Sequence, residues 1–356
     1  MSVSIISKPA LLVKKNTDLP LHRGEKEREK DSRSAPGQLN VGFSCGILIM
    51  GRNADSTQRG QGTMTILETV RDEKLTLSFE VFPPKTDAAF EEVLQATEEI
   101  AALKPSFISV TYGAGGKGGK YTMEIARTLQ NADGVETLAH LTCVGAGRED
   151  ISAYLRAMKD AGIRNIMALR GDLPEGMTPE DMKNSPYPHA SDLIREIRKA
   201  GDFCIGAACY PEVHPESTVQ AEDLHYLKEK VDAGADFLTT QMFFDNNLLY
   251  NFLYKLRETG VTVPVVPGIM PITRANQVKR ALKLSGSFMP RRFTSLVDKF
   301  GSSPDAMKRA GIIYACDQII DLYANGIRHV HVYTMNKPDV AAAIQNHLSG
   351  MLGRAF

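Results

Sequence analysis

The chain has 356 residues, and its 42 basic and 42 acidic side chains give a formal net charge of +0. This balance removes the electrostatic basis for nucleic-acid or anionic-membrane binding, and no apolar run approaches the length that spans a bilayer. The five cysteines are an odd number with no C-x-x-C pair, so a reducing, cytoplasmic location is expected rather than a disulfide framework.

The N-terminal segment differs in composition from the rest of the chain. Residues 22–38, HRGEKEREKDSRSAPGQ, are charged and rich in structure-breaking residues, and neither a helical nor a strand period persists through them. We predict that residues 1–63 form a disordered extension. Residues 64–356 are then expected to form a single catalytic domain.

From residue 75 onward, a strand-like segment followed by a helix-like segment recurs eight times. The strand-like segments are apolar and lie at 75–82, 107–113, 136–143, 165–172, 203–210, 236–244, 263–271 and 329–336. Eight such units favour an α/β fold of the (β/α)8 TIM-barrel type, with an extra helical insertion at about 288–326, before the last strand. A Rossmann sheet would carry a glycine fingerprint after the first strand, where this chain has Pro83 and Pro84.

The barrel architecture predicts where functional residues lie. Active sites of this fold form at the C-terminal ends of the strands. In this chain those ends carry polar groups embedded in apolar segments, at 80, 111–113, 140, 170–172, 210–214, 241, 268–271 and 333–337. We expect these groups to converge on one rim.

Glu80 lies in the apolar segment SFEVF, between two phenylalanines. Burial disfavours a carboxylate, so the pKa of Glu80 should be raised, which suits a general acid. A structural glutamate paired with an arginine is the alternative, and the segment does not decide between them.

Several other motifs have both a functional and a structural interpretation. His140 is a single histidine in a strand, which is commonly a core residue, whereas Tyr210 and His214 in YPEVHP could grip a planar, phosphate-bearing ligand or form a simple tight loop. His329 and His331 alternate on one strand face, but no carboxylate or cysteine completes a ligand spacing, so no metal site is expected.

Two glycine-containing motifs do not carry their best-known functions here. TYGAGGKGGKYT has Ala114 and Tyr121 where a Walker A motif needs Gly and Ser or Thr, although its backbone N–H groups could still contact an anion. The RGD at 170–172 directly follows a buried-type strand, whereas an adhesive tripeptide needs an exposed loop. A strand-end Arg and Asp around a glycine fit a ligand cradle better.

Eight short motifs follow one another at the strand ends: SFEVFPPK, VTYGAGG, HLTC, ALRGD, CYPEVHP, TQMFFD, PGIMPI and YTMN. This ordered set resembles the methylenetetrahydrofolate reductase family in its short, bacterial, flavin-dependent form, over about residues 66–350. The resemblance implies reduction of 5,10-methylenetetrahydrofolate to 5-methyltetrahydrofolate, in one-carbon metabolism and methionine biosynthesis. It also implies FAD as a non-covalent cofactor and NADH or NADPH as the hydride donor.

The resemblance also implies roles for individual residues. Glu80 matches the family's general acid, which assists opening of the methylene-bridged ring, and Asp172 matches the aspartate that orients folate and tunes the flavin. The positions implied to bind FAD are Thr111, Tyr112, Ala114, His140, Arg170, Gly171, Asp172, Ala190, Tyr210, His214, Asp223 and Lys230. The positions implied to contact the folate or the nicotinamide are Thr111, Asp172, Gln241, Tyr333 and Lys337.

The chain departs from the family pattern at two folate-facing positions. Lys337 stands where members often have an arginine that reaches the folate glutamate, and Ala275 stands where some have an aromatic residue that stacks on folate. A lysine keeps the charge but loses the bidentate fork. Both departures affect the expected folate affinity rather than the chemistry.

Two other functions remain open at this point. The chain could be an FAD- and folate-binding subunit of a larger redox complex, taking electrons from a partner protein. In either role, a homo-oligomer is compatible with the sequence. A barrel enzyme acting on a phosphorylated sugar would need a phosphate-gripping glycine turn near the last two strands. PGIMP and YTMNKP do not supply an obvious one.

Overall fold

The computed structural model of the protein describes residues 65–113, 118–174 and 176–353. The predicted extension at 1–63 lies outside the described residues, so its boundary with the catalytic domain stays a prediction.

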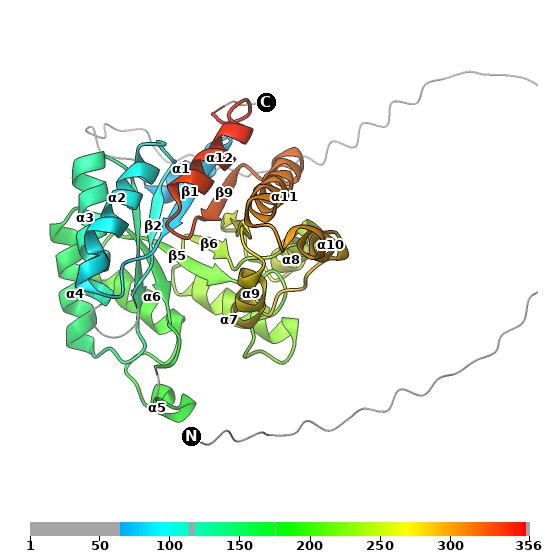
Figure 1. The fold of residues 1–356 in the computed structure, drawn as a ribbon. Helices are drawn as coiled ribbons and strands as arrows, with labels where there is room; N and C mark the ends of the chain where they lie inside the picture. The colour runs from blue at the N-terminus through cyan, green and yellow to red at the C-terminus, as the bar shows by residue number, and fades with distance from the viewer. Residues whose placement is uncertain (1–64, 114–117, 175, 354–356) are drawn as a thin grey trace, which may run out of the picture. The chain divides into compact units, whose positions relative to one another are not determined.

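The centre of the protein is a ring of parallel strands (Figure 1). Hydrogen-bonded neighbours follow the order β7-β6-β5-β4-β3-β2-β1-β9-β8. Strands consecutive in the chain are therefore neighbours in the sheet, except that β7 and β8 do not pair with each other and β9 pairs with β1. The strands are β1 (Thr76–Val81), β2 (Ile108–Val110), β3 (Thr137–Thr142), β4 (Asn165–Leu169), β5 (Cys204–Cys209), β6 (Phe237–Thr240), β7 (Val265–Val266), β8 (Gly268–Ile269) and β9 (His329–Tyr333).

The ring closes through one strand that proline divides into two segments. β7 pairs with β6, and β8, which begins after Pro267, pairs with β9. Proline has no N–H to donate to a ladder, but its carbonyl still accepts a 2.8 Å hydrogen bond from the His331 N–H. The nine segments therefore occupy eight strand positions, and the predicted (β/α)8 barrel is confirmed.

Helices connect the strands and surround the ring (Figure 1). The helices between strands are α2 (Phe90–Ala101), α3 (Gly118–Thr128), α4 (Arg148–Asp160), α5 (Pro179–Lys183), α6 (Ala190–Ala200), α7 (Gln220–Asp232), α8 (Asn246–Glu258), α9 (Asn276–Ser285), α10 (Arg291–Phe300) and α11 (Pro304–Ala324). Helices α1 (Ile66–Arg71) and α12 (Pro338–Leu348) flank the barrel in sequence, and a 3₁₀ turn η1 (Asp87–Ala89) and a π-helical turn η2 (Leu129–Asp133) adjoin α2 and α3. The predicted helical insertion before the last strand is present as α10 and α11.

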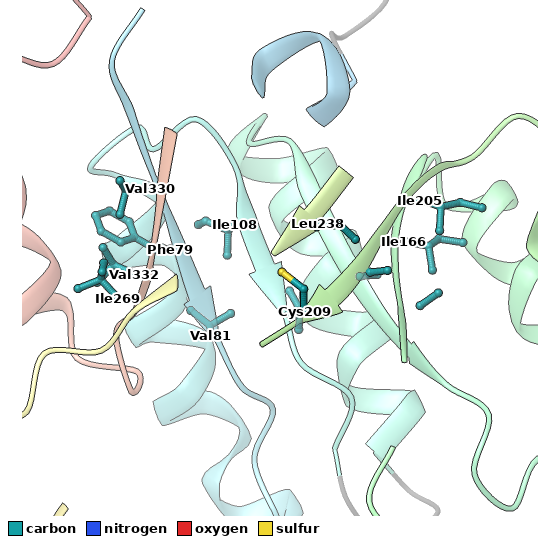
Figure 2. Packing of buried hydrophobic residues seen from close by; sticks show 14 of the residues in the cluster. Phe79, Val81, Ile108, Ile166, Ile205, Cys209, Leu238, Ile269, Val330 and Val332 are labelled. Atoms are coloured by element: carbon teal, nitrogen blue, oxygen red, sulfur yellow. The ribbon is translucent and has the colours of Figure 1, made fainter. Parts of the chain in front are cut away.

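Two apolar layers result from the alternation of side chains along the strands. The outward-facing residues pack under the helices, and Figure 2 shows members of this layer from most of the ring, including Phe79, Ile166, Leu238 and Val332. Each strand thus has one face buried under the helices and the other inside the ring. This burial of both faces explains the nearly continuous apolar runs that predicted a parallel sheet.

Helix α1 packs against the inner face at the N-terminal ends of the strands. Ile66 and Val70 are buried in one cluster with inward residues such as Phe107, Met167 and Phe237. The Ile66 N–H donates a 3.0 Å hydrogen bond to Oδ1 of Asn165, the first residue of β4. This apolar cluster fills that part of the interior and leaves the polar inward residues to the C-terminal half.

Candidate active site

A polar cluster occupies the inner face of the barrel where β1, β2, β3 and β9 lie side by side. Its members are Ser78, Glu80, Ser109, His140 and His331. Residues 78 and 80 on β1 are spaced two apart, as are 329, 331 and 333 on β9, so strand alternation points each set to the same face.

The Glu80 carboxyl is surrounded by neutral polar groups rather than by a cation. Its Oε2 accepts a 3.4 Å hydrogen bond from Ser109 Oγ and lies 3.8 Å from His140 Nε2 and 4.0 Å from His331 Nε2. Burial raises the pKa of Glu80 to about 8, and the Ser109 hydrogen bond opposes only part of that rise. Glu80 is therefore a protonated carboxylic acid at neutral pH, and the alternative of an arginine-paired glutamate is not what the described residues show.

His140 presents an unpartnered nitrogen beside Glu80. It is buried on β3, and its Nε2 has no hydrogen-bond partner among the described residues. Burial lowers the pKa of His140 to about 3, so the imidazole is neutral. A buried polar atom without a partner is costly, and a bound ligand is one way to satisfy it.

Tyr333 closes the cluster at the end of β9. Its hydroxyl donates a 2.5 Å hydrogen bond to the Thr240 carbonyl, and its ring meets the His331 ring edge-on at 5.5 Å. The close approach requires a glycine at 268, because a Cβ there would lie 2.2 Å from the Tyr333 hydroxyl. Burial, followed by the neighbouring Glu80, raises the pKa of Tyr333 well above its usual range.

A second group of predicted residues lies at the ends of β4, β5 and β6. Arg170 donates two hydrogen bonds of 2.6 Å to the carboxylate of Glu216, one from each terminal nitrogen. The neighbouring Gly171 has a φ of +91°, and a Cβ there would lie 2.7 Å from Cγ1 of Val144. The RGD segment is thus a tightly held strand-end turn whose middle position favours glycine, and its role as a ligand cradle stays a prediction.

The loop after β5 is joined to α7 by the predicted histidine and aspartate. The backbone N–H of His214 donates a 3.2 Å hydrogen bond to the Asp223 carboxylate, and the His214 ring lies 4.6 Å from the Tyr210 ring, edge to face. Lys230 Nζ donates to the Ala208 carbonyl at 3.0 Å, and burial lowers its pKa. Tyr210 is also hydrogen-bonded to the side chain of Gln241.

Two further predicted residues lie near this second group with few contacts of their own. Asp172 is exposed, within electrostatic range of Arg170 and Tyr210, and Ala190 is the buried first residue of α6. Neither side chain touches the polar cluster around Glu80 in the contacts of the described residues.

The residues after β2 divide between two directions. Thr111 continues the strand pairing through a 3.0 Å hydrogen bond from its N–H to the Val81 carbonyl. The Tyr112 ring lies 5.7 Å from that of Tyr154, so its side chain packs against α4 and not toward Glu80. Ala114 lies outside the described residues.

Lys337 is the N-cap residue of α12, in the loop that follows β9. Its Nζ donates a 3.1 Å hydrogen bond to Thr273 Oγ1, and partial burial, followed by the charge of Arg274, lowers the pKa of Lys337. The loop that follows β8 therefore meets the loop that follows β9 through this contact. Ala275 lies in the same loop and leaves no aromatic ring there.

Sequence reasoning missed Ser78 and Ser109 as members of the site and considered His331 only as a metal ligand. These three residues could have been found from their spacing, because each lies two positions from a predicted site residue on the same strand segment: 78 from 80, 109 from 111, and 331 from 333. Glu216 was also missed, because a contact across two loops leaves no local pattern. Among the described residues, no group of three or more His, Cys, Asp or Glu side chains is placed to hold a metal ion.

The family model described as methylenetetrahydrofolate reductase matches residues 65–349, which includes the whole barrel. The chain belongs to the methylenetetrahydrofolate reductase family. It is 36% identical over 271 residues to the 5,10-methylenetetrahydrofolate reductase of Pectobacterium carotovorum, covering 76% of this chain and 89% of that protein. The corresponding enzyme of Escherichia coli is 34% identical, with 76% and 90% covered.

Longer members of the methylenetetrahydrofolate reductase family match the same region. The chain is 39% identical over 297 residues to methylenetetrahydrofolate reductase (NADH) 1 of Zea mays, covering 80% of this chain and 50% of that protein. The chain therefore spans about half the length of the plant relatives and most of the length of the bacterial ones.

A solved structure supports the fold independently of sequence. An uncharacterized protein from Clostridium thermocellum that binds two copies of 5-methyl-5,6,7,8-tetrahydrofolic acid superposes with a TM-score of 0.57 at 12% identity, covering 80% of this chain and 98% of that one. At this identity the likeness concerns the barrel alone. Within the described part of the chain, no helix is long and apolar enough to cross a membrane.

Proposed function

We propose that this protein reduces 5,10-methylenetetrahydrofolate to 5-methyltetrahydrofolate, with FAD as its bound cofactor and NADH or NADPH as the hydride donor. The observation that carries the proposal is the protonated Glu80 carboxyl, held inside the barrel beside the unpartnered nitrogen of His140. Membership in the methylenetetrahydrofolate reductase family supplies the reaction to which this acid belongs.

The residues at the strand ends fit a planar cofactor that carries phosphates. His140 offers a buried nitrogen in need of a partner, and a glycine at 171 lets the strand-end turn pack closely against Val144. Arg170 lies in the second group of residues, and a diphosphate there would have to replace Glu216 as the partner of its guanidinium. When bound, FAD would supply the hydride that it receives from the nicotinamide.

The chemistry assigned to the chain itself is proton donation by Glu80. As the methylene-bridged ring opens, the bond between the methylene carbon and the departing nitrogen breaks, and its electron pair stays on that nitrogen. Glu80 donates its proton there, which leaves a positively charged iminium at the other nitrogen, ready for hydride at the methylene carbon. Glu80 then regains a proton from solvent.

The remaining predicted residues are assigned to binding. Asp172 is exposed and uncommitted in the described contacts, so its carboxylate can reach the pterin of a bound folate. Gln241 is held beside Tyr210 at the ends of β5 and β6, where folate or nicotinamide would stack. Lys337 lies in the loop after β9 and is assigned to the folate glutamate, whose carboxylate it would bind as a point charge.

A visible absorption spectrum of the purified full chain tests the proposal. We expect flavin bands that bleach on anaerobic addition of NADH or NADPH and return when methylenetetrahydrofolate is added. The plant relatives are named for NADH, so NADH is tried first. Flavin bands that neither nucleotide bleaches would instead indicate a subunit that takes electrons from a partner protein, and a chain that binds no flavin on reconstitution would contradict both functions.

A further inference from the structure

In the described part of the chain, the ring nitrogens of His331 make hydrogen bonds only with hydroxyl groups. Ser78 Oγ lies 2.7 Å from its Nδ1, and Ser109 Oγ lies 3.0 Å from its Nε2. The side chain is 2% exposed, and burial, with a smaller contribution from His140, lowers its pKa to about 3. The ring is therefore neutral, with one nitrogen that donates and one that accepts.

The neighbouring His329 shows how the partners of a histidine ring normally determine which ring nitrogen carries the proton. Its Nδ1 lies 2.7 Å from Thr76 Oγ1, and its Nε2 lies 3.1 Å from the Asp72 carbonyl oxygen. A carbonyl can only accept, so Nε2 carries the proton and Thr76 donates to Nδ1. The two hydroxyls around His331 can each donate or accept, so its tautomer depends on what lies beyond them.

Two self-consistent arrangements exist for His331. In the first, Ser78 donates to Nδ1, Nε2–H donates to Ser109, and Ser109 donates to Glu80 Oε2 at 3.4 Å. In the second, Ser109 donates to Nε2, Nδ1–H donates to Ser78, and Ser78 donates to the Val330 carbonyl, also at 3.4 Å. Only in the first does a hydroxyl group donate to the Glu80 carboxyl group.

The surroundings of Glu80 favour the first arrangement. In the second, Oε2 would receive no proton from Ser109 and would lie 4.0 Å from the lone pair of His331 Nε2. The charge left on Glu80 after proton donation would then have no hydrogen bond within the cluster, which is costly in a buried site. In the first arrangement the same hydrogen bond serves both the acid and the carboxylate.

We infer that His331 is a positioning residue for the proton of Glu80. It acts as the Nε2–H tautomer and directs the Ser109 hydroxyl toward Glu80 Oε2, which leaves Oε1 to carry the proton that is transferred. The other titratable groups that face Glu80 are His140 from β3 and Tyr333 from β9. Tyr333 already donates its proton to the Thr240 carbonyl, so it does not compete for Oε2.

This inference deepens the proposed function, and its first test does not depend on turnover. The full chain is labelled with ¹⁵N-histidine, and the two ring nitrogens of His331 are identified by the signals that disappear in His331→Phe. We expect Nε2 to carry the proton in a neutral ring. A proton on Nδ1 would overturn the inference, whether or not the protein reduces folate.

The second test measures the titration of Glu80 itself, by carbon NMR of the labelled carboxyl in the absence of folate and nicotinamide. Ser109→Ala and His331→Phe should each raise its titration midpoint by about one pH unit, because the first removes the hydrogen bond to the carboxylate and the second removes the N–H that directs the Ser109 hydroxyl toward it. His331→Gln, which keeps an N–H donor, should restore part of the shift. Ser109→Ala removes little volume, so this test does not depend on the larger substitution folding.

His329→Phe is the matched control, since it makes the same change on the same strand face and has no contact with Glu80 among the described residues. It should leave the Glu80 midpoint unchanged. An unchanged midpoint in Ser109→Ala, or an equal shift in His329→Phe, would show that His331 has a structural role only. Failure of the flavin to bleach would count against the proposed function and leave these two readouts intact.

Discussion

The pKa of Glu80 predicts a specific pH dependence for the folate half of the reaction. With a pKa of about 8, about nine-tenths of Glu80 is protonated at pH 7 and about one-tenth at pH 9. If the protonated form is the catalyst, the rate of that step falls about tenfold between these two pH values. A carboxyl at its ordinary value of 4.5 would be about 0.3% protonated at pH 7, so burial raises the available acid about 300-fold.

The assay follows flavin reoxidation in a stopped-flow spectrophotometer. The enzyme is reduced anaerobically and mixed with methylenetetrahydrofolate at pH values from 6 to 10. Glu80→Gln keeps the shape of the side chain but has no acidic proton, so its reoxidation rate should fall by about 10²–10⁴-fold and lose its pH dependence. Reduction of the flavin by nicotinamide should change little in the same variant, which controls for misfolding.

Two results would refute this reasoning. The first is a reoxidation rate that is the same at pH 7 and pH 9 in the wild-type enzyme, because the protonated fraction of Glu80 would then not limit the step. The second is Glu80→Gln retaining more than about a tenth of the wild-type rate, since a general acid contributes at least about a hundredfold.

Three further changes probe the rim of the barrel. Gly171→Ala places a Cβ against Val144 at positive φ and should lower the free energy of unfolding by about 1–3 kcal/mol, measured by urea denaturation; an unchanged midpoint would mean that the turn adjusts. Lys337→Arg should lower the KM for folate about fivefold by adding a second hydrogen bond to a carboxylate, and an unchanged KM would place the folate glutamate elsewhere. Asp172→Asn should weaken folate binding and shift the flavin midpoint potential in an equilibrium redox titration, and a wild-type potential with wild-type affinity would remove Asp172 from the site.

The fold was predictable because its signals are periodic and local. Continuous apolar segments such as 107–113 and 203–210, each followed by a helical pattern, indicate buried parallel strands. Eight repeats then favour closure into a barrel. The division of the seventh strand at Pro267 could also be anticipated, because proline interrupts a ladder wherever it occurs.

The inner cluster was only partly predictable because its contacts join distant strands. The segment SFEVF predicts a raised pKa for Glu80, and the structure agrees, but nothing near residue 80 indicates that residues 109 and 331 supply its neighbours. Those contacts depend on the register between β1, β2 and β9, in which Glu80 is paired with Ser109 and with Tyr333. Register is a property of the closed sheet, and the sequence of one strand does not contain it.

The burial that makes Glu80 an acid also costs the protein stability. The folded state binds a proton between about pH 4.5 and pH 8 that the unfolded chain releases near pH 4.5, so stability falls as the pH rises through that window. At about 1.4 kcal/mol per pH unit, the loss at pH 7 is about 3 kcal/mol. A hydrogen bond strong enough to cancel this loss would lower the pKa and remove the acid. The weak 3.4 Å contact from Ser109, in place of a cation, is therefore what a proton donor at this position requires.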